Sequence, residues 1–266
     1  MHTTFTGNRQ PITSQPTAGF GPNGEGIFVY FGTGKYVEVS DKEVDLSNPE
    51  PQTFYGIIDR NTNTNTDIVS SRSNLLQQSI ILETVGGVDF DDLDEDGNVV
   101  ATQTFDIRVT SEEEILSTHR GWYVDLVSPS GYQGERQVST SALRNGRVLF
   151  TTLIPSNDPC DPGGTGWLMA LDAQSGGRVD DIVFDLSGDD EFNDEDTVEI
   201  TLPDGSNVFV PVSGKQSKVG IVPSPALLSN QELTHVYLPG TKGEIQEDTL
   251  SSGPADFGRQ SWHQLR

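Results

Sequence analysis

The chain has 266 residues and a formal net charge of −24, with 40 Asp and Glu against 16 Lys and Arg. Such a field repels phosphate backbones and anionic lipid surfaces, so we expect no nucleic acid among its partners and no membrane insertion. No apolar run is long enough to span a bilayer, and the first residues lack the basic start and apolar stretch of a signal peptide.

Short runs of β-branched and aromatic residues recur between turns rich in Gly and Pro. Residues 26–31 and 36–39 flank the turn sequence Gly-Thr-Gly-Lys, which predicts a first hairpin. Further strands are predicted, in order, at residues 53–58, 79–85, 121–126, 147–154, 166–171, 197–200 and 208–210. Trp122 and Trp167 lie in two of these runs, and we expect both to be buried between packed sheets. The pattern predicts an all-β sandwich, barrel or propeller.

Residues 185–196 have the spacing of a calcium-binding loop. Ca²⁺ takes six to eight oxygen ligands, which a twelve-residue loop supplies from positions 1, 3, 5, 7, 9 and 12. In this chain those positions are Asp185, Ser187, Asp189, Glu191 (through its backbone carbonyl), Asn193 and Asp196. Position 6 is Asp190 where Gly is usual, and position 12 is Asp where Glu is usual, so we expect modest affinity. The alternative is a solvated acidic loop.

Other polar stretches are interpreted as connections. Asp92–Asp96 begins like a second calcium loop but then lacks ligands at Val100 and Gln103, which favours a hairpin turn and leaves calcium binding there open. Residues 60–66 are expected to be a polar connector. Residues 240–258 show no apolar period and are expected to be a mobile loop.

No catalytic arrangement is evident. The four His are scattered, no Gly-x-Ser-x-Gly is present, and Gly32-Thr33-Gly34-Lys35 lacks the upstream Gly of a phosphate-binding loop. Cys160 is the only cysteine, which excludes an internal disulfide and leaves open a partner outside the chain. We therefore expect a protein that is not an enzyme.

Residues 166–177 end in Ala-Leu-Asp-Ala-Gln-Ser-Gly, which resembles the blade ending of quinoprotein-like β-propellers. A blade takes about 40–45 residues in four antiparallel strands. Residues 1–266 are then one segment holding three or four blades, with long acidic loops, and so part of a β-propeller. An open ring leaves unpaired strand edges, so we expect the upstream half of the propeller to be a partner, with residues 236–238 available for edge pairing.

The sequence resembles the C-terminal portion of the PilY/PilC family of type IV pilus proteins. The resemblance is carried by residues 29–36, 52–57, 121–126, 134–136, 150–160, 164–173 and 258–266. It implies a modified β-propeller with bound calcium in an exported protein at the pilus tip, the outer membrane surface or the periplasm. It also implies minor pilins of the pilus tip as partners, and a role in pilus extension and retraction, twitching and surface attachment.

The chain also departs from the family pattern. The family's best-known calcium loop lies upstream of the matching region, and the large N-terminal adhesive region and an Arg-Gly-Asp motif are absent. The acidic insertion at residues 181–200 therefore carries the calcium prediction on its own ligands. Two alternatives stay open, a quinoprotein-like propeller enzyme and an acidic secreted β-domain of unknown binding role.

Overall fold

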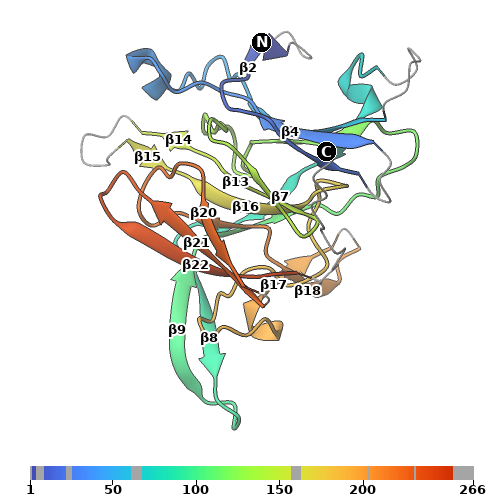
Figure 1. Ribbon diagram of the computed structural model, residues 1–266. Coiled ribbons are helices and arrows are strands. Elements are labelled where there is room, and N and C mark those ends of the chain that lie inside the picture. Colours follow the sequence, from blue (N-terminus) through green and yellow to red (C-terminus); the bar gives the residue numbers. More distant parts are fainter. Residues whose placement is uncertain are drawn as a thin grey trace, which may run out of the picture.

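The computed structural model describes residues 2–3, 9–21, 26–60, 68–156, 163–202, 204–230 and 232–253. Its regular structure there is almost entirely β, with three short 3-10 helices and no α-helix (Figure 1). The expected all-β class is confirmed. Cys160, the sequence match at residues 258–266 and nearly all of the polar connector at 60–66 lie outside the described residues.

A five-stranded sheet contains most of the N-terminal half. Its strands, in spatial order, are β3 (Thr17–Phe20), β4 (Ile27–Gly32), β5 (Thr53–Asp59), β11 (Gly121–Asp125) and β6 (Leu76–Gln78). All neighbours are antiparallel except β11 and β6. The hairpin predicted between residues 26–31 and 36–39 is wrong, because β4 pairs with β3 and β5. The side chain of Asp41 accepts the amides of Val37 and Glu38, which holds that segment in a loop leading to the 3-10 helix η2 (Val39–Lys42).

A six-stranded antiparallel sheet lies next to the first one. Its strands, in spatial order, are β12 (Ala142–Arg144), β13 (Arg147–Thr151), β16 (Trp167–Asp172), β19 (Gly214–Gln216), β10 (Ile107–Thr110) and β7 (Ile80–Glu83). Both large sheets exceed the four strands of a standard blade, as fits a modified propeller. The strands predicted at residues 53–58, 79–85, 121–126, 147–154 and 166–171 all lie in these sheets or their immediate extension.

Smaller sheets complete the fold. They are β20 (Ala226–Ser229), β21 (Leu233–Pro239) and β22 (Ile245–Ser251); β17 (Thr197–Thr201) with β18 (Asn207–Pro211); β8 (Val88–Leu93) with β9 (Val99–Phe105); β14 (Ile154–Pro155) with β15 (Gly164–Thr165); and β1 (His2–Thr3) with β2 (Gln10–Pro11). The β8–β9 hairpin projects from the body of the molecule (Figure 1). The hairpin-turn interpretation of residues 92–96 is confirmed.

Two expectations about the C-terminal region are wrong. Residues 245–251 of the segment expected to be mobile form strand β22, whereas residues 254–258 of that segment lie outside the described residues. Residues 236–238 lie in β21, which has a partner on each side. An inward-facing position of β22 is Asp248, whose carboxylate lies 2.6 Å from the buried Nζ of Lys215. Because a buried position of this strand is an aspartate in an ion pair, the sequence does not show the alternation of apolar and polar residues that predicts a strand.

The two large sheets enclose an aromatic core. Phe54 of β5 stacks on Phe150 of β13, with ring centroids 3.8 Å apart. Trp122 and Trp167 are fully buried, as expected, and Trp122 donates its indole N–H to the carbonyl of Ala173. Trp122 pairs across the strands with Gly56, where an added Cβ would lie 2.4 Å from the indole ring. A second core packs the other face of the six-stranded sheet against β17, β18, β21 and β22.

We predict that Trp122→Ala and Trp167→Ala each lower the free energy of unfolding by about 3–5 kcal/mol, because each leaves a large cavity between packed sheets. Chemical denaturation of the purified chain measures this. Phe20→Ala is the control, since Phe20 is 84% exposed. Equal stability of the two Trp variants and the control would show that the indoles do not hold the sheets together.

Candidate functional site

The acidic loop at residues 185–196 is anchored to the core at its first residues. Phe184 and Leu186 are buried, Phe184 bridges to Leu250, and the amide of Asp185 donates to the carbonyl of Thr249. The loop ends in the 3-10 helix η5 (Asp194–Asp196), immediately before β17. The loop is therefore attached to β22 at its first residues and continues into β17 at its end.

Asp196 and Asp185 close the loop by accepting its own backbone amides. Asp196 Oδ1 accepts the amides of Leu186 (2.6 Å) and Ser187 (2.9 Å), and its Oδ2 accepts the amide of Asn193 (3.3 Å). Asp185 accepts the amides of Gly188 (2.6 Å) and Asp190 (3.2 Å). Burial raises the pKa of both carboxyl groups, although these N–H donors act in the opposite direction. Both carboxyl groups thus lie in a partly dehydrated place where a nearby cation would stabilise their charged form.

The other predicted ligands differ in burial. Ser187 is buried and donates its hydroxyl to Asp189, Glu191 is exposed, and Asn193 caps η5 by accepting the amide of Glu195. Asp190 has a φ of +63°, the left-handed conformation for which Gly is usual at position 6 of a calcium loop. The turn expected at this position is therefore formed by an Asp.

The structure brings Asp189 together with Asp92 and Glu195. One carboxylate oxygen of each lies within 4.8 Å of the others, and this is the only such group of three or more acidic, His or Cys side chains among the described residues. Asp92 comes from β8, and the amide of its neighbour Leu93 donates to Glu195 Oε2. The cluster therefore joins the projecting hairpin to the loop.

Sequence reasoning found only Asp189 of this cluster as a ligand. Asp92 was noticed as the first residue of a possible second loop, whereas Glu195 occupies a position without a ligand role in the twelve-residue pattern. Asp92 and Glu195 are about a hundred residues apart in the chain, so no local spacing could relate them. The four other predicted side-chain ligands serve mainly as hydrogen-bonding groups within the loop.

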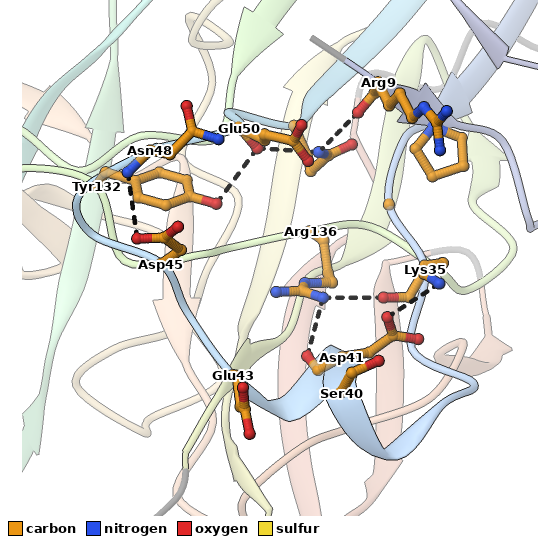
Figure 2. Close-up of a pocket in the computed structure, with 13 residues that line it drawn as sticks. Arg9, Lys35, Ser40, Asp41, Glu43, Asp45, Asn48, Glu50, Tyr132 and Arg136 are labelled. Atoms are coloured by element: carbon orange, nitrogen blue, oxygen red, sulfur yellow. Dashed lines mark hydrogen bonds and ion pairs between the residues drawn. The ribbon is translucent and has the colours of Figure 1, made fainter.

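A second feature is a polar cavity of about 750 Å³ (Figure 2). The segment from Gly34 to Gln52 forms most of its wall, and Arg9, Pro11, Tyr132 and Arg136 complete it. Asp41 organises this wall, because its carboxylate accepts two backbone amides and lies 3.3 Å from Lys35 Nζ. Burial alone would raise the pKa of Asp41, but these hydrogen bonds keep it below the ordinary value.

Arg136 enters the cavity from a segment fixed by a buried ion pair. Arg108 of β10 is fully buried, and its guanidinium donates two hydrogen bonds of 2.7 Å to Glu135 and one of 2.7 Å to Glu83. The same guanidinium lies 4.0 Å from the ring centroid of Trp167. Glu135 is therefore held in place, and Arg136 follows it in the chain.

Comparisons with known proteins identify the relatives of this fold. The family model described as the PilY1 beta-propeller domain matches residues 2–87. A crystal structure of the Pseudomonas aeruginosa PilY1 C-terminal domain superposes with a TM-score of 0.71 and 26% identity, covering 95% of this chain and 47% of that one. Within the part of the chain that the structure describes, no helix has the length and apolarity needed to cross a membrane.

Curated relatives carry the same name. The type IV pilus biogenesis factor PilY1 of Pseudomonas aeruginosa strain PAO1 is 29% identical over 97% of this chain, and a PilY1 homolog from Xylella fastidiosa is 32% identical over 69% of it. The chain spans only 21% and 13% of the lengths of these two proteins. The chain thus belongs to the PilY1 family and corresponds to part of its C-terminal β-propeller domain.

Proposed function

We propose that this chain is a non-enzymatic part of a type IV pilus biogenesis protein. The observation that carries the proposal is the match of 95% of the chain to the C-terminal domain of PilY1, supported by relatives that are named as pilus biogenesis factors. The protein would be exported and would act at the pilus tip or the outer membrane surface. There it would contact minor pilins and influence pilus extension, twitching and surface attachment.

The described ionisable groups support a role without catalysis. His119 accepts the amide of Leu116 through its Nδ1, and Nδ1 of His235 lies 3.3 Å from Glu247 at a partly exposed position. The buried acids Glu135 and Asp248 have cationic partners. In each case the group has a structural partner in place of a nucleophile that it could activate.

The rest of the propeller is the first partner that we propose. The solved PilY1 domain extends well beyond the part that this chain matches. At the edge of the five-stranded sheet, Phe20 of β3 and its cross-strand neighbour Ile27 are exposed. An exposed apolar sheet edge favours pairing with another segment, which supports a covering by the upstream half of the same propeller.

We further propose that the acidic loop binds calcium. The supporting observation is the Asp92, Asp189 and Glu195 cluster, which offers only carboxylate oxygens, the ligands that Ca²⁺ prefers. Asp189 belongs both to this cluster and to the twelve-residue ligand pattern. Asp185 and Asp196 would then shape the loop, and a cation at the cluster would fasten the projecting hairpin to it.

Isothermal titration of the purified chain with CaCl₂ tests this proposal. We expect a dissociation constant of roughly 10⁻⁴–10⁻³ M, typical of extracellular modules. Asp189→Asn should abolish binding, whereas Asp204→Asn, at an exposed turn between β17 and β18, should leave it unchanged. Loss of calcium binding in Asp92→Asn and Glu195→Gln would assign the ligands to the cluster. If these two variants still bind calcium and Asp185→Asn does not, the ligands belong to the twelve-residue pattern. No binding heat from the native chain would refute the proposal.

The role in pilus biogenesis is tested in the source bacterium. Removal of the coding region for these residues should abolish twitching zones and strongly reduce surface pilin, because the propeller would be incomplete. If calcium is needed for pilus biogenesis, Asp189→Asn should also reduce twitching and surface pilin, while the melting temperature of the purified variant stays normal. Wild-type twitching and surface pilin in the deletion strain would contradict the proposal, whatever the result of the titration.

A further inference from the structure

The polar cavity contains a cation without a carboxylate partner. Among the described residues, Arg108, Lys215 and the partly buried Arg72 each lie within 3.0 Å of a carboxylate oxygen, and the buried Arg147 lies 3.6 Å from Asp181. Arg136 is partly buried too, yet its hydrogen bonds go to the backbone carbonyls of Gly134, Lys35 and Asp41. Burial accordingly lowers the pKa of this guanidinium. A charge in this state gains most from an incoming anion.

The guanidinium of Arg136 is held in a position where it could bind an anion. Nη1 donates to Lys35 and Asp41, and Figure 2 shows the other terminal nitrogen turned away from these two carbonyls. The backbone of Arg136 is fixed by two hydrogen bonds to Leu153, and its stem packs on Gly34. A Cβ at Gly34 would lie 2.4 Å from Cβ of Arg136, so only glycine allows this approach.

The surroundings restrict the ligand. Four acids, Asp41, Glu43, Asp45 and Glu50, line the cavity with three cations, Arg9, Lys35 and Arg136, so its net charge is negative and disfavours a multiply charged phosphate ion more than a single carboxylate. A single carboxylate flanked by positive charge fits this arrangement. The segment that forms most of this wall also carries Val37, Val39 and Leu46, which do not line the cavity and are 83%, 84% and 71% exposed. Exposed aliphatic side chains on the same segment favour contact with a protein over contact with a small ion.

We propose that this cavity binds a peptide segment of a partner protein. A carboxylate of the segment pairs with Arg136, and basic side chains on either side of it lie against Glu43 and Asp45. Apolar residues of the partner cover Val37, Val39 and Leu46. The inference uses none of the calcium-loop residues and stands whether or not that loop binds a metal.

Fluorescence anisotropy with short peptides tests the proposal on the complete chain. The probes are a labelled, end-blocked Lys-Ala-Glu-Ala-Lys peptide and the same peptide with Gln in place of Glu. We expect the Glu probe to bind at least about tenfold more tightly than the Gln probe, as for a charge-assisted pair in a partly dehydrated place. Arg136→Gln should remove this difference. Arg136→Lys should reduce it, because a single ammonium group cannot donate to the backbone carbonyls that hold the guanidinium and also present a second nitrogen to the carboxylate.

Two controls make the result decisive. Arg144→Gln changes an exposed arginine on the edge strand β12 and should leave both affinities unchanged, while melting curves verify that the Arg136 variants are folded. Equal binding of the two probes, or none at about 1 mM, would overturn the proposal. So would equally tight competition by free glutamate, which would indicate a small-molecule site. A native dimer that Arg136→Gln dissociates would instead assign the cavity to a second copy of the chain.

Discussion

Carboxylates outnumber cationic side chains 40 to 16 in this chain, so most of them cannot have an ionic partner within the molecule. Two of the available cations pair with carboxylates that would otherwise be buried alone. Arg108 of β10 pairs with Glu83 of the neighbouring strand β7 and with Glu135 of the segment before β12, and Lys215 pairs with Asp248 between the six-stranded and three-stranded sheets. Removal of one partner of such a pair leaves an uncompensated buried charge, which costs about 3–5 kcal/mol. The Lys215 pair therefore joins two sheets, and the Arg108 group joins the segment of Glu135 to the six-stranded sheet.

Other carboxylates are stabilised mainly by backbone amides. Asp41, Asp185 and Asp196 each accept two or more amides, and each holds a loop in one conformation by doing so. The consequence differs between the two loops. The Asp41 loop also contains Lys35 and surrounds Arg136, whereas the loop at residues 185–196 collects carboxylates without any cation. The same shortage of positive charge thus makes one loop a candidate for a metal and the other for a partner's carboxylate.

The sequence predicted most of the strands that have an apolar face, because the core of this fold is built from alternating β-branched and aromatic residues. Trp122 and Trp167 were recognised as core for this reason. Strand β22 was missed because one of its buried positions is Asp248, and the first hairpin was wrong because the Asp41 hydrogen bonds replace a strand ladder. Asp92 and Glu195 meet only through the tertiary fold, and the state of Arg136 depends on Glu135 being held by a distant arginine. Contacts of this kind leave no local signal in the chain.

The central claim is that calcium completes the loop at residues 185–196, which contains no cationic side chain. Hydrogen–deuterium exchange of the chain with and without calcium tests this claim most directly. The amides of Leu186, Ser187 and Gly188 donate to the two buried carboxylates, and the amide of Leu93 donates to the cluster. The account predicts that calcium slows exchange at these four amides together, while the β17–β18 turn is unaffected. Exchange rates that do not change with calcium, or that change equally throughout the chain, would contradict it.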